Sequence, residues 1–473
     1  MTRDGNPVIV GAGPAGVRAA QALVGHGLRP VVIDEAPRWG GQIYRQQPDG
    51  FRRTAGQLYG FEAGRARALH EAFADLLPHV DYRPGQLVWN AGAHQLDLWE
   101  AATGRHASLP WRDLILATGA TDRILPVPGW TTPGVYSLGG AQVALKFQGC
   151  AIGQQVVLAG SGPLLYLVAY QYKKAGAEVR AVLDYASTAE QAGALLPMSR
   201  LPAVLAKGLY YVAWLRLHGV PIHASARLAR VEGEYGVEAV HWVSRTDPSE
   251  THRIACDALG FGYGLRPENQ LADLLGCGFA FDPQQRAHLV AQQQGQSSVP
   301  GVFVAGDGAR ILGADAAELA GERAALKLLA QRGIAVDMAR MARLDARLAR
   351  IAAFRAGLER AFPFPRDWAA QVPDHTVVCR CEAVTAGEIR RAAREQGADE
   401  MNRMKALCRV GMGRCQGRMC GVAGAELLAH ACARPVELVG RIRGQAPVKP
   451  VPVAGLESRL ESGQVAGEGV RHG

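Results

Sequence analysis

The sequence predicts an α/β protein with two dinucleotide-binding units followed by a small helical unit rich in cysteine. A short apolar strand followed by a glycine-rich turn occurs twice, at residues 8–16 and 156–165. Each copy leads to a second apolar strand that ends in an acidic residue, Glu35 or Asp184. Five of the cysteines crowd into residues 379–420. The repeated pattern is typical of βαβ units in parallel sheets, and the cysteines indicate a metal site.

The composition is that of a globular protein with several domains. Its 473 residues are 48% hydrophobic and 20% charged, which is ordinary for a folded chain. The net charge is +9, but the basic residues are scattered and not interleaved with aromatics, so we expect no nucleic-acid partner. The apolar segment 156–172, which contains two glycines and a proline, is too short for a membrane span. With a strand already at 8–10 and no signal peptide, we expect a cytoplasmic protein; peripheral contact with a membrane stays open.

The first glycine-rich turn has the residues of a dinucleotide-binding site. Gly11 permits the tight turn, and Gly13 lets the backbone approach a pyrophosphate. Gly16 allows the helix to pack closely against the strand. Pro14 and Ala15 begin this helix, whose N-terminal N–H groups would face the phosphates.

An acidic residue and a second glycine turn follow the next strand. We expect Glu35 to bind the ribose hydroxyls because it directly precedes a turn. An alternating strand would point Asp34 to the opposite face. In the second turn, Gly41, Gln42 and Arg45 are candidates to meet phosphate or a flavin.

Two later strands favour FAD over NAD as the first dinucleotide. The strand at 114–116 ends in small residues, and the strand at 302–304 ends in a glycine and an aspartate. The acid can accept hydrogen bonds from a ribityl chain, and the expected helix at 313–323 would direct its N-terminus at the pyrimidine end of a flavin. The candidate residues in these two segments are Ala117, Thr118, Gly119, Gly306 and Asp307.

Residues 6–330 resemble the flavoprotein disulfide-reductase-like superfamily, whose fold has two glutathione-reductase-like dinucleotide domains. The resemblance implies that the Ala-Thr-Gly and Gly-Asp segments are FAD-binding segments. The expected units are an FAD-binding unit at 1–122 and 285–330, a second dinucleotide-binding unit at 123–284, a helical connector at 331–373, a cysteine-rich unit at 374–440 and an irregular tail at 441–473.

The second glycine-rich motif departs from the pattern. Leu165 stands where the third glycine belongs, so it either pushes the helix away or fills the space of a nicotinamide nucleotide. Gly160, Gly162 and Asp184 still fit, and the aspartate would favour NAD over NADP. NAD therefore stays doubtful here, with an empty site or another adenine nucleotide as alternatives.

Four cysteines are candidate metal ligands. Cys379 and Cys381 form a Cys-x-C pair, and Cys415 and Cys420 form a Cys-x₄-C pair. Four thiolates are what a [2Fe–2S] cluster or a structural zinc ion requires. Cys408 lies outside the pattern and is expected to be a bystander. The isolated cysteines of the nucleotide-binding units, expected to be buried and not a redox dithiol, are Cys150, Cys256 and Cys277.

Residues 378–382 and 411–421 resemble the [2Fe–2S] domain of the bacterioferritin-associated-ferredoxin (BFD-like) type, which implies a [2Fe–2S] cluster on the four cysteines. The order of the units resembles the α (A) subunits of opine oxidases and of D-hydroxyproline and L-proline dehydrogenases, and the B subunit of hydrogen cyanide synthase.

That resemblance implies a partner, an amino-acid-oxidase-like flavoprotein subunit that oxidises the substrate C–N bond. The present chain would relay electrons through the cluster and FAD to an acceptor and would contain no catalytic residues of its own. An FMN at a subunit interface and a small third ferredoxin-like subunit are further expectations of this kind. The alternatives are a free-standing NAD(P)H-dependent reductase and, more weakly, an iron-delivery module.

Overall fold

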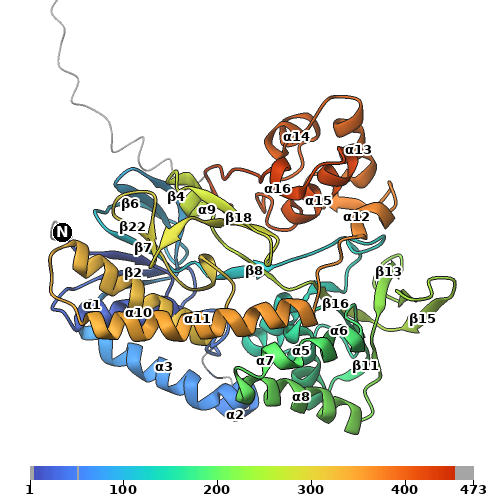
Figure 1. Ribbon diagram of the computed structural model, residues 1–473, viewed down its shortest axis with the longest axis horizontal. Coiled ribbons are helices and arrows are strands. Elements are labelled where there is room, and N and C mark those ends of the chain that lie inside the picture. Colours follow the sequence, from blue (N-terminus) through green and yellow to red (C-terminus); the bar gives the residue numbers. More distant parts are fainter. Residues whose placement is uncertain (1–4, 49, 51–52, 453–473) are drawn as a thin grey trace, which may run out of the picture.

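The computed structural model describes residues 5–48, 50 and 53–452. This part of the chain forms three units, two of them spanned by a long helix (Figure 1). The sheet of the first unit has, in order, β20 (Gln292–Gln293), β21 (Gln296–Ser297), β22 (Val302–Val304), β7 (Leu114–Leu116), β1 (Val8–Val10), β2 (Val31–Asp34) and β3 (Asp81–Pro84). From β22 to β3 the strands are parallel, with β1 paired to both β2 and β7.

Two layers cover the sheet of the first unit. One face packs on helices α1 (Pro14–Val24), α3 (Ala63–Leu76) and α10 (Ala314–Gln331). The other face packs on a small antiparallel sheet made of β4 (Gln86–Gly92), β5 (Gln95–Glu100) and β6 (His106–Pro110). Because both faces are covered, β1, β7 and β22 are buried along their whole length, which explains their continuous apolar sequences.

The second unit repeats the plan with a smaller sheet. Its parallel strands are, in order, β12 (Ile222–His223), β11 (Glu178–Asp184), β10 (Gln155–Gly160), β16 (Ala258–Gly262) and β9 (Val135–Ser137). Helix α5 (Pro163–Lys174) follows β10, as α1 follows β1. The repeated glycine-rich motif therefore does mark two βαβ units.

The chain returns to the first unit earlier than the sequence suggested. The two crossing segments, β8 (Ala120–Asp122) and β17 (Leu265–Pro267), pair as antiparallel strands. After them, Leu271, Ala272 and Cys277 are buried in the same core as β1. Residues 265–284, which the sequence placed in the second unit, thus pack with the first.

The connector contains the long helix α11 (Met338–Ala361), which runs along the first and second units (Figure 1). Its apolar side packs on α10 and on α7 (Leu195–Met198). Part of its basic side is used within the molecule, since Arg340 pairs with Glu322 at 2.6 Å. The amphipathic pattern therefore fits an intramolecular brace.

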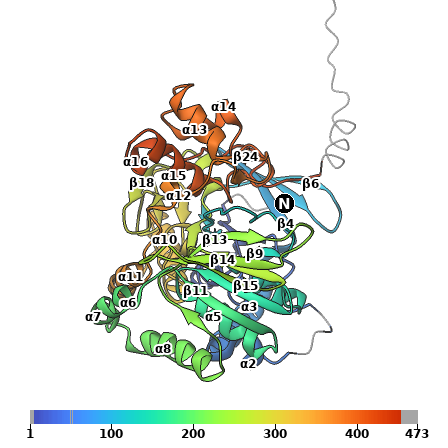
Figure 2. The same ribbon diagram turned by 90° about the vertical axis from the view of Figure 1, so that its right-hand side faces the viewer.

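The cysteine-rich unit is a small helical body above the other two (Figure 2). Its elements are β23 (Val377–Cys379), β24 (Val384–Thr385), α13 (Ala386–Arg394), α14 (Met401–Cys408), α15 (Gly421–Ala431) and α16 (Val436–Val439). A capping box begins α13, with Thr385 and Glu388 bonded reciprocally.

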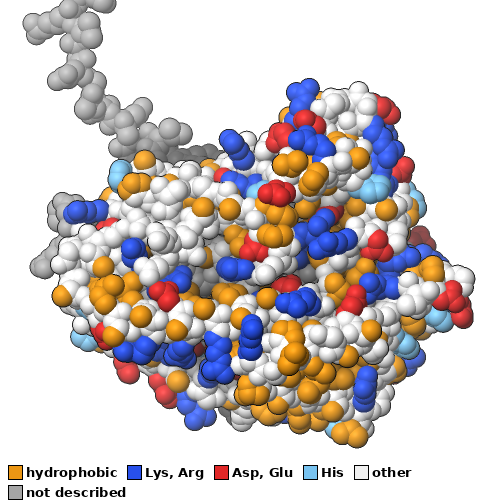
Figure 3. Space-filling model, viewed as in Figure 1, with side chains coloured by type: hydrophobic (Ala, Val, Ile, Leu, Met, Phe, Trp, Pro, Cys, Tyr) orange, Lys and Arg blue, Asp and Glu red, His pale blue; other side chains and the backbone are white. Residues whose placement is uncertain are grey.

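Helix α8 (Pro202–Leu217) is apolar on nearly all sides yet buries few side chains. Leu217, and Leu196 of the neighbouring α7, are each 83% exposed. Hydrophobic side chains gather at the bottom of the space-filling view, the region of α7 and α8 (Figure 3). Among the described residues, no helix is both long and apolar enough to cross a membrane.

Candidate functional site

The first glycine-rich turn is closed by backbone contacts that leave no room for side chains. A Cβ on Gly11 would lie 2.3 Å from the Ala117 carbonyl oxygen, and one on Gly16 would lie 1.8 Å from the Gly11 oxygen. A Cβ on Gly41 would lie 2.9 Å from the Gly13 Cα. The two glycine turns therefore meet at the N-terminus of α1, which is free of side chains as close approach of a pyrophosphate requires.

The two acidic residues at the end of β2 have different tasks. The Ala12 N–H donates to the Asp34 carboxylate at 2.6 Å, and the Ala36 N–H donates to its other oxygen at 2.7 Å. Asp34 therefore holds the glycine turn, while Glu35 points outward and pairs with Lys449 of the tail. This matches the expected alternation, and the ribose-binding role of Glu35 remains a prediction.

Arg45 has an unused donor beside the two glycine turns. Its Nη2 donates to Gln42 at 2.7 Å, and its guanidinium lies 5.1 Å from the ring centroid of Phe147. Its buried Nε has no partner among the described residues. Burial lowers the pKa of Arg45, against the effect of the nearby acids. An anion such as a phosphate would satisfy this donor.

The Gly-Asp segment abuts the start of α1. A Cβ on Gly306 would lie 2.9 Å from the Ala15 Cβ. Asp307 accepts through Oδ1 from the N–H groups of Leu312 and Gly313, at 2.9 and 3.0 Å. Its Oδ2 has no partner among the residues that the structure describes and can accept from a ligand. These contacts bring the predicted glycines, Asp307 and Ala117 together in one place, and their arrangement fits FAD.

The second nucleotide motif is closed. Leu165 is fully buried, in a core that includes Leu138 of α4 (Leu138–Val143) and Leu158 of β10. Asp184 is also fully buried, and it accepts from the Tyr166 hydroxyl at 2.6 Å and from Gln191 at 2.7 Å. Burial raises the pKa of Asp184 to about 6. The carboxylate that would bind a ribose is thus already occupied by side chains of its own unit.

The four predicted cysteine ligands converge. The Cys420 sulfur lies within interaction distance of the Cys379 and Cys415 sulfurs, and Cys415 also contacts Cys381. The contact with Cys420 lowers the pKa of Cys379 to about 6 and holds that of Cys415 below its usual value. A Cβ on Gly413 would lie 2.2 Å from the Cys381 Cβ, so only glycine fits there.

Four sulfurs on two loops fit the ligand set of a [2Fe–2S] cluster. Among the described residues, no group of three or more His, Cys, Asp or Glu side chains already has the geometry of a metal site. The Cys-x-C pair is extended only at its start, since Cys379 ends β23 and Cys381 lies in a turn.

The remaining cysteines behave mostly as expected. Cys408 is not among the bonded four and donates to the Met404 carbonyl at 3.2 Å. Cys256 and Cys277 are buried. Cys150 is exposed, contrary to the prediction, because it follows a left-handed turn at Gly149.

The loop between Cys415 and Cys420, called the cysteine loop below, is joined to the FAD-binding unit by a contact that no sequence motif predicts. Arg418 donates to Glu268 with Nε at 2.6 Å and Nη2 at 3.1 Å. The Glu268 N–H donates to the Gly119 carbonyl at 2.9 Å, and its own carbonyl accepts from the Thr118 hydroxyl. Burial acts to raise the pKa of Glu268, but Arg418 and Arg266 outweigh it and hold the pKa below its usual value.

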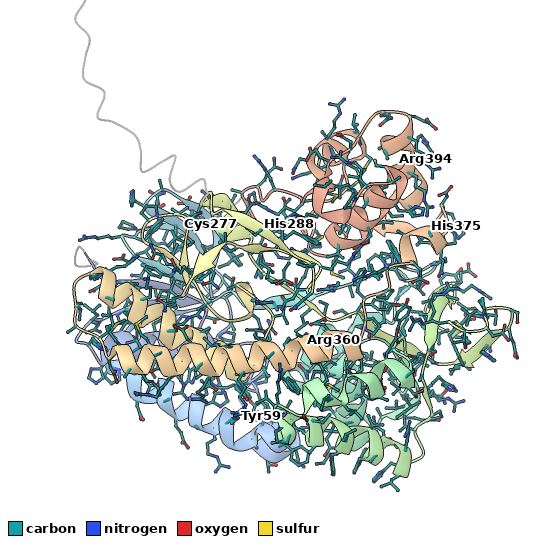
Figure 4. The ribbon with its side chains drawn as sticks, viewed as in Figure 1. Tyr59, Cys277, His288, Arg360, His375 and Arg394 are labelled. Atoms are coloured by element: carbon teal, nitrogen blue, oxygen red, sulfur yellow. The ribbon has the colours of Figure 1, made fainter. Side chains whose placement is uncertain are left out.

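More ion pairs fasten the same interface. Arg286 forms a bidentate pair with Glu426 at 2.6 and 2.7 Å, and Arg441 does the same with Asp273. Figure 4 places Cys277 and His288 on the part of the first unit that lies nearest to the cysteine-rich unit, which carries Arg394. The cysteine-rich unit is therefore docked on the FAD-binding unit and not merely tethered to it.

The tail also returns to the FAD-binding unit. Val448 is buried in the core behind β1, and its N–H donates to the Trp89 carbonyl at 2.9 Å. The Val448 carbonyl accepts from Arg418 of the cysteine loop. The described part of the predicted irregular tail, residues 441–452, thus packs on other units, and its remainder lies outside the described residues.

Comparison with known proteins gives two family matches. Residues 5–325 match the pyridine nucleotide-disulphide oxidoreductase family, and residues 374–458 match the sarcosine oxidase A3 domain. The chain is 37% identical to hydrogen cyanide synthase subunit HcnB of Pseudomonas protegens, over 94% of this chain and 96% of that protein. It is 34% identical to the A subunit of opine oxidase from Agrobacterium tumefaciens, over 95% and 90% of the two chains.

Among solved structures, L-proline dehydrogenase from P. horikoshii is similar to this fold, with a TM-score of 0.70 and 19% identity. The similarity covers 95% of this chain and 79% of that one. Together with the two nucleotide-binding folds and the helical C-terminal unit, these matches show that the chain belongs to the pyridine nucleotide-disulphide oxidoreductase family of flavoproteins, in the group that contains HcnB and the A subunit of opine oxidase.

Proposed function

We propose that this chain is the electron-transfer flavoprotein subunit of a hetero-oligomeric amino- or imino-acid dehydrogenase of the opine, hydroxyproline or proline type. A partner subunit of the amino-acid-oxidase type oxidises the substrate. This chain passes the electrons through a [2Fe–2S] cluster and FAD to an acceptor. The relatives named as subunits of larger enzymes support a partner.

One observation carries the proposal: Glu268 links the loop between Cys415 and Cys420 to the predicted FAD-binding segment at Thr118 and Gly119. Arg418 lies between two predicted cluster ligands, and its partner Glu268 bonds directly to Thr118 and Gly119. A docked interface of this kind would hold two redox groups at a fixed separation. A cluster that only delivered iron would not need this contact.

Each protein group has a definite task in this scheme. FAD, when bound, would exchange electrons with the one-electron cluster and with the acceptor. The N-terminus of α1 and the Arg45 guanidinium would hold its phosphates, Glu35 its ribose and Asp307 its ribityl chain. For Glu35 to do so, it would release Lys449 or share its carboxylate with it. The four cysteines would hold the cluster, with N–H groups of Gly411 and Gly417 donating to their sulfurs.

The second candidate, a free-standing NAD(P)H-dependent reductase, is disfavoured by the second nucleotide motif. Asp184 is sealed by Tyr166 and Gln191, and Leu165 fills the place where the helix should approach the strand. Electrons must therefore enter from another source. The exposed apolar side chains of α7 and α8 also fit a chain that associates with another protein.

The proposal is tested by co-expression with an amino-acid-oxidase-like chain from the same genome. The two chains should co-purify, and substrate-to-dye electron transfer should require both. A Cys415→Ser chain should still bind the partner and FAD but lose that transfer, whereas Cys408→Ser should retain it. Full transfer in the Cys415→Ser complex would contradict the proposed route.

A further inference from the structure

Arg266 belongs to the FAD-binding unit, yet its guanidinium reaches into the cysteine loop. It stands in β17, one of the two strands that link the nucleotide-binding units. Its Nη1 donates to the carbonyls of Gly417 and Arg418, both at 3.3 Å. These two carbonyls lie in the loop between Cys415 and Cys420. A cation from one unit thus binds the backbone of the other beside its predicted metal ligands.

The geometry connects this cation to a cysteine sulfur through one peptide group. In a trans peptide the C=O and N–H bonds point in opposite directions. The Arg418 carbonyl accepts from Arg266, and the Met419 N–H of the same peptide donates to the Cys415 sulfur. Hydrogen bonds in series polarise one another. Arg266 therefore strengthens the N–H donation to Cys415 as well as holding the loop.

The charge of Arg266 is weakly compensated compared with its neighbours. Arg418 is neutralised by its bidentate pair with Glu268. Arg266 forms no ion pair within 4.0 Å among the described residues, and burial lowers its pKa because water is largely excluded from the guanidinium. Arg414, next to Cys415, is exposed to water, which screens its charge. Arg266 is thus a buried cation beside the cysteine loop, and its charge is offset through space, chiefly by Glu268, and not by a direct ion pair.

We propose that Arg266 is a positioning residue that raises the reduction potential of the cluster, so that this potential depends on docking of the cysteine-rich unit against the FAD-binding unit. The inference rests on the proposed function, since it requires a [2Fe–2S] cluster on the four cysteines. Reduction adds one negative charge to the cluster. A nearby buried cation and a polarised N–H donor both favour the reduced form.

The test is a redox titration of the full-length purified chain, followed by electron paramagnetic resonance of the reduced cluster. In Arg266→Gln the ratio of reduced to oxidised cluster at a fixed potential should fall about ten-fold or more. This corresponds to about 59 mV for a one-electron couple. Arg266→Lys keeps the charge but loses the planar fork, so it should shift the same way by less. The matched control Arg414→Gln should stay within about two-fold of wild type.

The outcomes separate this inference from the proposed function. A wild-type chain that holds no iron would overturn the proposed function, and with it the inference, before any variant is compared. An iron-loaded Arg266→Gln chain whose cluster has the same reduction potential as wild type would overturn the inference alone. If Arg266→Gln does not retain iron, Arg266→Lys decides, and an unshifted titration of that variant would overturn the inference.

Discussion

Replacing Glu268 by glutamine removes the negative charge from the contact between the FAD-binding and cysteine-rich units. Glu268 is buried, and its two oxygens accept from Arg418 at 2.6 and 3.1 Å. Glutamine has nearly the same shape but leaves the largely enclosed guanidinium of Arg418 without a counter-charge. Breaking one partner of a buried pair costs about 3–5 kcal/mol. We expect this loss to weaken the interface between the cysteine-rich unit and the FAD-binding unit.

The assay is amide hydrogen exchange of residues 411–421 by mass spectrometry. At about 1.4 kcal/mol for each factor of ten, opening of the interface should become roughly 10²- to 4 × 10³-fold more frequent in Glu268→Gln. The matched control is Asp399→Asn, because the Asp399–Arg434 pair is solvent-exposed in the same unit. An exposed pair contributes about 0–1 kcal/mol, so exchange should change less than about ten-fold. Equal exchange in the two variants would refute the reasoning.

Four further predictions follow from the same contacts. Cys415→Ser should lose iron and the visible absorption of the cluster while FAD stays bound, whereas Cys408→Ser should keep its iron; full iron in Cys415→Ser would show that this thiol is no ligand. NADH should bleach the flavin slowly or not at all in anaerobic mixing, and fast stoichiometric bleaching at micromolar NADH would favour the reductase alternative. Leu165→Ala should lower the free energy of unfolding by about 2–5 kcal/mol, because it leaves a cavity in a fully buried core, and it should not create NADH binding while Asp184 stays sealed, which a fluorescence titration would check. The pKa of Asp184 is raised from 3.8 to about 6, so the folded state keeps its proton to a higher pH than the unfolded state and loses stability as the pH rises from 4 to 6. Over that range the free energy of unfolding of Asp184→Asn should rise relative to wild type by up to about 3 kcal/mol, which thermal melts would detect as a higher melting temperature. A difference between the two chains that does not depend on pH would contradict this.

The nucleotide-binding folds could be predicted because their information is local. A strand, a glycine turn and a helix start occupy about ten consecutive residues, and Gly11 and Gly16 are each required by a close backbone contact. The contact of Gly16 with Gly11 is an example. The same holds for the cysteine pairs, whose ligands lie two and five residues apart. Local spacing was enough to expect that these sulfurs would meet.

The contacts between units could not be predicted, because they join residues far apart in the chain. Arg418 and Glu268 are separated by 150 residues, and neither belongs to a recognisable motif. Burial also decided points that the sequence left open. Leu165 could have displaced the helix or filled a ligand space, and the structure places it in the core of the second unit. The return of the chain to the first unit at β17 could not be predicted either, because the amino-acid composition does not change where β8 and β17 pair.

The central claim is that electrons reach this chain from a partner and not from a substrate of its own. The most direct measurement is anaerobic mixing of the purified chain, alone and then with its partner subunit, with proline, hydroxyproline, glycine and an opine, while flavin and cluster absorbance are followed. The account predicts no reduction of the chain alone, and reduction of both chromophores when the partner is added with its substrate. Reduction of the chain alone at a rate sufficient for turnover would contradict the account and would make this chain the dehydrogenase itself.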